Sequence, residues 1–271
     1  MCNESLPNES PTMNRYSTFA ILSLLSLSTQ AMAVDVRVTV TNLLGPTSSA
    51  FSPIITSAHS GAVDQFNSGS AASPGVEDVA ELGATGATLI TEILAQQPTA
   101  IAAPTQNAGG GFGPLLPGAS QSVVLSGLDP MANRYFSYLS MFVPSNDTFI
   151  GNDSPTAIQL FDAGGAFIAG GFTLTADRLW DAGSEVNGLF GSAFIAGQSA
   201  ADGADEGGVV TAADFANGFD FYQGQTTGPG YVYASSFNAD TPIISFAFEV
   251  VPEPTTAALA ALLALAACLR R

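Results

Sequence analysis

Residues 135–143 read YFSYLSMFV, and this almost continuous apolar run predicts the central strand of a sheet. A run of this length between turn residues is typical of a strand that is buried on both faces. Residues 144–153, PSNDTFIGND, follow directly, and residues 180–187 read WDAGSEVN. Both stretches set acidic side chains beside Gly, Ser and Asn, so polar loops are expected where the apolar strands end.

The flanking sequence predicts a mainly β fold. Alternating or β-branched apolar residues favour strands, and they occur at 34–42, 53–58, 122–125, 157–162, 166–174 and 243–250. The turn Ala163-Gly164-Gly165 predicts a hairpin between two of them. Ser73-Pro74 is typical of a helix N-terminus, so short helices are expected from there to Gly83 and over 87–97. Together these elements predict an antiparallel β-sandwich with one or two short helices.

The composition excludes several classes of partner. The chain has 271 residues, with 23 acidic side chains, 6 basic ones and a net charge of -17. All the basic residues are Arg. Binding to nucleic acid relies on Lys and Arg that neutralise phosphates, and anionic membrane surfaces attract cationic segments for the same reason. Neither is therefore expected as a partner.

Residues 1–33 predict a signal peptide. Arg15 precedes the apolar stretch 19–27, and Ala31-Met32-Ala33 provides the small residues of a cleavage site. The residues before Met13 carry two Glu and no positive charge, which does not suit a signal peptide and favours Met13 as the true start. The protein is therefore expected to be exported.

Residues 251–271 predict a sorting tail. Val251-Pro252-Glu253-Pro254 precedes the apolar run 257–269, which is shorter than the roughly 17–25 residues of a transmembrane helix. The segment is expected to enter a membrane only transiently, with Arg270-Arg271 on the cytoplasmic side. This order resembles the PEP-CTERM sorting signal of Gram-negative bacteria, which implies an exosortase-type sorting machinery as partner and a secreted or cell-surface location. A plain membrane anchor is the alternative.

The body between these ends, residues 34–250, is expected to form one domain. Its loops are not held by disulfides, because Cys2 and Cys268 lie outside it. It keeps the whole net charge of -17, because acidic and basic residues balance in the two ends. Residues 98–118 predict a loop, and the Gly-rich acidic residues 188–231 predict a long loop or an insertion. A bound cation is a natural means of holding such loops.

Calcium is the cation that suits these loops, because it prefers oxygen ligands from carboxylates, carbonyls and water. The turn 181–185 offers two carboxylates. Asp147 joins them if its strand lies beside the one that ends near Asp181. Asp153 and Asp162 are second choices. The alternative is that these carboxylates only cap turns, as Asp often does.

Several short motifs, taken in order, resemble the spondin domain, also called spondin_N. They are Asn42-Leu43 after an alternating strand, Ser52-Pro53, His59, FNSG at 66–69, ASPGVE at 72–77, AELG at 80–83, NDTFIG at 146–151 and WDAGSE at 180–185. The resemblance spans about residues 34–187, which is most of the body. Beyond Gly188 only a closing strand is apparent.

The resemblance implies a C2-like antiparallel β-sandwich with a calcium ion at one end. Carried over by motif, the metal ligands are Asp147, Asp181 and Glu185. The sequence departs from the animal members at Asn146, where Pro is common, at Ser184, where Thr stands, and at Glu185, where Asp stands. Animal members act in extracellular matrix and cell adhesion. The resemblance thus implies an adhesive or structural role at the bacterial surface or in extracellular polymer, with a surface polysaccharide or another adhesion partner.

No motif supports catalysis, so a non-enzymatic protein is expected. His59 is the only histidine, and no Gly-x-Ser-x-Gly elbow is present. One His and no Cys in the body exclude a typical zinc cluster. A glycosidase needs two carboxylates across a sugar cleft, and Trp180 is the only Trp for stacking on sugars. A carbohydrate-binding module is the main alternative function, and an extracellular hydrolase ranks behind it.

Overall fold

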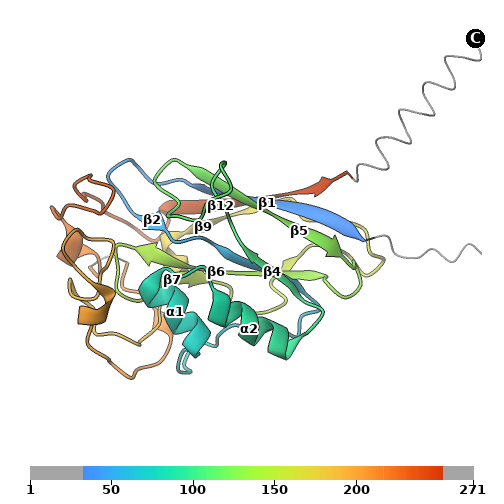
Figure 1. Ribbon diagram of the computed structural model, residues 1–271, viewed down its shortest axis with the longest axis horizontal. Coiled ribbons are helices and arrows are strands. Elements are labelled where there is room, and N and C mark those ends of the chain that lie inside the picture. Colours follow the sequence, from blue (N-terminus) through green and yellow to red (C-terminus); the bar gives the residue numbers. More distant parts are fainter. Residues whose placement is uncertain (1–32, 216, 253–271) are drawn as a thin grey trace, which may run out of the picture. The chain divides into compact units, whose positions relative to one another are not determined.

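The computed structural model describes residues 33–215 and 217–252 (Figure 1). The signal peptide and the sorting tail expected from the sequence therefore lie outside the described residues, apart from their innermost positions. Within the described ranges, no helix combines the length and the hydrophobicity that crossing a membrane requires.

Two antiparallel sheets form the fold, as the sequence predicts. The smaller sheet has the strand order β5 (Ser120–Leu128), β1 (Val34–Asn42), β12 (Pro242–Val251) and β9 (Phe172–Thr175). The larger sheet follows the order β11 (Thr211–Ala212), β10 (Leu179–Asp181), β7 (Thr148–Gly151), β6 (Tyr135–Val143), β3 (Ile55–His59) and β4 (Ile101–Pro104). Two short strands, β2 (Ala50–Phe51) and β8 (Ile158–Gln159), also pair with β6.

The strand β6 separates two hydrophobic cores. On one face its Phe136 and Phe142 join the core between the sheets, with valines of β1 and Phe246 of β12. On the other face Leu139 joins the core under the helices. Every residue of β6 except Tyr135 is buried. A strand covered on both faces has no need of alternating polar residues, which explains the continuous apolar run.

Two helices cover the outer face of the larger sheet (Figure 1). They are α1 (Pro74–Leu82) and α2 (Ala87–Gln96), and three single 3-10 turns occur at Ala176–Arg178, Ala200–Asp202 and Asp220–Tyr222. The Ser73 hydroxyl accepts the Val76 N–H and caps α1, and Gly83 ends it with a left-handed φ of 58°. Both helix signals in the sequence are therefore confirmed.

The prediction of a loop over residues 98–118 is wrong in part. The strand β4 lies within this range and pairs with β3, with Ala102 opposite Ser57. Ala and Pro have low strand propensity. The strand forms because β3 offers an unpaired edge, which local composition does not reveal.

The predicted hairpin around Ala163-Gly164-Gly165 is reduced to a turn. Phe161 and Phe167 form a single bridge across it, and β8 and β9 then belong to different sheets. Gly171, with a φ of 97°, lies so close to the Phe246 carbonyl that a side chain there would collide with it. This close approach lets the chain cross to the smaller sheet, where β9 pairs with β12.

Candidate metal centre

The turn between β6 and β7 sets the position of Asp147. The Ser145 hydroxyl accepts the Thr148 N–H at 3.0 Å and holds the turn tight. The next strand pair places Thr148 opposite Asp181, and the Asp147 carbonyl accepts the Ala182 N–H at 3.2 Å. The strand β7, which begins directly after Asp147, therefore lies beside β10, which ends at Asp181. This is the condition that the sequence analysis set.

The turn after β10 is closed by Asp181. Its Oδ1 accepts the Gly183 N–H at 2.8 Å, and its Oδ2 accepts a hydrogen bond from Asn187 Nδ2 at 2.5 Å. Gly183 has a φ of 64°, and a Cβ there would lie 2.6 Å from the Val209 carbonyl oxygen. Asp181 thus performs the turn-forming role that Asp often has, and Gly is required at the bend.

Asp147 is fully buried, and only half of its carboxylate is hydrogen-bonded. Its Oδ2 accepts the Ser184 N–H at 3.1 Å and the Glu185 N–H at 3.2 Å. Its Oδ1 has no hydrogen-bond partner among the described residues. Burial, with the nearby Asp181 carboxylate, raises the pKa of Asp147 to about 7. Such a group favours the binding of a proton or of a cation.

Glu185 lies in a cradle of glycine backbone. Side chains at Gly191 or Gly203 would collide with its carboxyl oxygens. Only 5% of Glu185 is exposed, and burial, followed by the Glu81 carboxylate, raises its pKa to about 7. Its Oε2 has no hydrogen-bond partner in the described part of the chain. The two glycines therefore allow the following loop to close directly over this carboxyl group.

The donor chemistry of this region suits calcium. Four of its buried oxygen atoms lack a hydrogen-bond partner among the described residues: Asn146 Oδ1, Asp147 Oδ1, Ser184 Oγ and Glu185 Oε2. Hard oxygen atoms are the ligands that calcium takes. Within residues 33–215 and 217–252, however, no group of three or more His, Cys, Asp or Glu stands close enough to hold a metal ion as it is. The structure thus gathers the predicted ligands in one region without drawing their carboxylates together.

An acidic segment, residues 203–209, runs along the turn 183–186. The Gly208 N–H donates to the Gly183 carbonyl at 2.7 Å, and the Glu206 N–H donates to the Ser184 carbonyl at 2.8 Å. Asp205 of this segment lines a cavity of about 390 Å³ with Glu77 and Glu81. Further carboxylates therefore surround the candidate ligands.

Sequence reasoning missed part of this site. Asn146 and Ser184 lie in motifs that the sequence analysis quoted, but only their burial shows that their oxygen atoms lack partners. No local signal assigns the acidic segment to the turn 183–186. The second-choice acids make hydrogen bonds outside this region. Asp162 Oδ1 accepts two N–H groups of its own turn, and Asp153 Oδ1 accepts the Ser68 N–H.

His59 is fully buried at the end of β3, opposite Tyr135 of β6. Its Nδ1 accepts the Gly61 N–H at 3.0 Å, which leaves Nε2 to donate to the Ser137 hydroxyl at 2.9 Å. Among the described residues, no carboxylate hydrogen-bonds to the ring. A catalytic triad needs such a third group to orient the imidazole, so the arrangement is that of a packed histidine.

We expect His59 to make the fold sensitive to acid. Burial lowers the pKa of His59 from 6.5 to about 4. Its contribution to stability is therefore fully present above pH 6.5 and is lost as the pH falls toward 4. Between pH 7 and pH 4, the free energy of unfolding should fall by about 3 kcal/mol more in the wild type than in His59→Gln. Urea unfolding in saturating calcium measures this, and equal losses in both proteins would contradict it.

The chain matches a model of a known protein family. A family model described as Spondin_N matches residues 45–199, which is more than half of the chain. The matched range includes Asp147, Asp181 and Glu185, together with the glycine cradle at Gly191 but not Gly203. No curated protein matches the chain.

Proposed function

Because the chain belongs to the Spondin_N family, we propose that it is a calcium-binding spondin-like module with an adhesive or structural role. The proposed location is the cell surface or the extracellular polymer of a Gram-negative bacterium, in keeping with the signal peptide and sorting tail expected from the sequence. The exosortase-type machinery is the partner proposed for that tail. The role is proposed to be non-enzymatic, which the burial of the only histidine supports.

One observation carries the calcium proposal: the loops after β6 and β10 hold buried oxygen atoms without hydrogen-bond partners in the described part of the chain, and the Ser184 and Glu185 N–H groups donate to Asp147 across the two loops. Asp147, Asp181 and Glu185 would supply negative charge to the ion. Asn146 and Ser184 would supply neutral oxygen atoms. Bound calcium supplies the positive charge that offsets repulsion among these carboxylates.

The chain's own residues prepare the loops for this role. Ser145 fixes the turn before Asp147, and Gly183 allows the bend after Asp181. The Asn146 side chain donates to the Val186 carbonyl at 2.8 Å and so ties the two loops together. A module whose loops are held in this way presents a fixed surface to an adhesion partner or a surface polysaccharide.

Titration calorimetry tests the calcium proposal. The wild-type protein is expected to bind calcium saturably, and Asp181→Asn is expected to weaken binding by at least about tenfold, because it removes one ligand charge. Asp162→Asn is the matched control, since it makes the same chemical change at a turn elsewhere and should bind like the wild type. Absence of calcium binding by the wild type would mean that these carboxylates only form turns.

A further inference from the structure

Two Asn-Gly pairs lie beside one cavity near the end of β10. The sequence holds Asn187-Gly188 and Asn217-Gly218. Both asparagines line a cavity of about 260 Å³, as does Asp181. An asparagine that precedes glycine is especially prone to lose its side-chain amide, because glycine has no side chain to shield its backbone nitrogen. Both asparagines are exposed, so water and hydroxide can reach them.

The two asparagine side chains are held in the same way. Asn187 Nδ2 donates to Asp181 Oδ2 at 2.5 Å, and Asn217 Nδ2 donates to Asp214 Oδ2 at 3.2 Å. Each Asn-Gly pair also has an apolar residue before it and another after it. The local sequence and the side-chain contacts therefore predict similar reactivity for the two asparagines.

The backbone nitrogen that follows each asparagine differs between the two pairs. The Gly218 N–H donates to the Asp214 carbonyl at 2.7 Å, whereas the Gly188 N–H makes no hydrogen bond among the described residues. A Cβ at Gly218 would lie 2.6 Å from the same Asp214 carbonyl oxygen. A Cβ at Gly188 would meet only the Val186 carbonyl oxygen, at 4.0 Å. The Gly188 nitrogen is therefore free to react, and the Gly218 nitrogen is held in place.

We propose that Asn187 is a site of spontaneous deamidation, and that the fold protects Asn217 from the same reaction. The Gly188 nitrogen loses its proton to hydroxide and attacks Asn187 Cγ. The new C–N bond closes a succinimide ring, the Cγ–Nδ2 bond breaks, and ammonia leaves with a proton taken from water, which restores the hydroxide. Water then opens the ring to aspartate or isoaspartate. The net reaction consumes water and releases ammonia, and it needs no oxidant or reductant.

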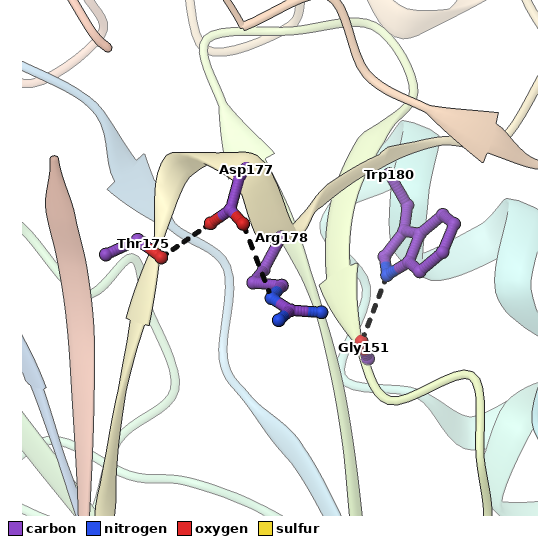
Figure 2. Close-up of polar contacts among 5 residues, drawn as sticks. All are labelled: Gly151, Thr175, Asp177, Arg178 and Trp180. Carbon is purple, nitrogen blue, oxygen red and sulfur yellow. Dashed lines mark hydrogen bonds and ion pairs between the residues drawn. The ribbon is translucent and has the colours of Figure 1, made fainter. Parts of the chain in front are cut away.

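The product changes the turn after β10. Trp180 Nε1 donates to the Gly151 carbonyl at 3.1 Å and helps to tie β10 to β7 (Figure 2). Asp181 ends this strand, so its carboxylate stays in place when its donor is lost. A carboxylate at position 187 cannot donate to Asp181 Oδ2 and repels it. Deamidation thus loosens the turn and adds a negative charge beside a proposed calcium ligand. This last effect rests on the proposed function, whereas the reaction itself does not require calcium.

Peptide mapping by mass spectrometry tests the proposal on the full chain, incubated with a chelator at mildly alkaline pH. Asn187 is expected to deamidate about five- to tenfold faster than Asn217, because the hydrogen bond of the Gly218 N–H must break before attack. In urea the two rates should become similar. Gly188→Ala should slow the reaction at Asn187 and leave Asn217 unchanged. The fold should accept this alanine, because Gly188 has no left-handed φ and has space for a Cβ.

Three outcomes would overturn the proposal: an unmodified Asn187, equal rates at Asn187 and Asn217 in the folded protein, or the same ratio of rates in urea. Asn187→Asp reproduces the charge of the product. With a chelator, its melting temperature should lie about 2–4 °C below that of the wild type, and an equal value would contradict the predicted loosening. A calcium titration of the wild type is a separate test. Absence of calcium binding would contradict the proposed function without changing the expected deamidation rates.

Discussion

Asp147→Asn is expected to abolish most of the stabilisation that calcium gives the wild-type protein. At a free calcium concentration about a thousandfold above its dissociation constant, the wild type should gain about 4 kcal/mol in free energy of unfolding. The substitution removes the fully buried charge and retains an oxygen atom that can accept the Ser184 and Glu185 N–H groups. The variant should therefore fold without gaining from calcium. Urea unfolding with calcium and with a chelator measures the gain in free energy of unfolding for each protein.

When calcium is absent, the same variant should instead be more stable than the wild type. Burial raises the pKa of Asp147 from 3.8 to about 7. The stability that the protonated carboxyl contributes is fully present below pH 3.8 and is lost as the pH rises through 7. In chelator at pH 8, Asp147→Asn should therefore be more stable than the wild type by about 2–4 kcal/mol.

The difference between the two proteins isolates the Asp147 carboxyl, because His59 titrates in both. At pH 4 that difference should shrink toward zero, since the wild-type carboxyl is then protonated. If the wild type gains nothing from calcium, or if the variant gains equally, Asp147 does not bind the ion.

Phe142→Ala is expected to lower the free energy of unfolding by about 3–5 kcal/mol. Phe142 is fully buried on β6, and its ring meets those of Phe51, Phe219 and Phe237 at centroid distances of 5.2, 5.1 and 5.6 Å. Truncation leaves a cavity that these rings cannot fill without losing contacts with one another. Chemical denaturation measures the loss.

The position of Phe142 predicts a second effect of the same substitution. Phe219 and Phe237 belong to the irregular part of the chain before β12, so Phe142 joins this part to the core. Amide exchange should accelerate there more than in β1. Phe190→Ala provides the control, because Phe190 is 69% exposed and its loss should change stability by less than about 0.5 kcal/mol. Equal effects of the two substitutions would contradict this assignment.

Parts of the candidate site were predictable because they depend on short motifs. The Asp181–Gly183 turn forms through a hydrogen bond between residues two positions apart. Such turns can be predicted from the local sequence. The buried, half-bonded state of Asp147 was not predictable. It depends on Ser184 and Glu185, which lie on another strand connection. The cradle around Glu185 needs Gly203, and nothing near that glycine indicates its neighbour.

The sequence by itself determined the central strand β6, the start and end of α1, and the mainly β character of the fold. Hydrophobic period and capping chemistry act over a few residues, so they can be recognised without knowledge of distant contacts. Only the tertiary structure decided that β4 is a strand and that β9 crosses to the smaller sheet. Each of these depends on the meeting of segments far apart in the chain, where packing and pairing outweigh local propensity.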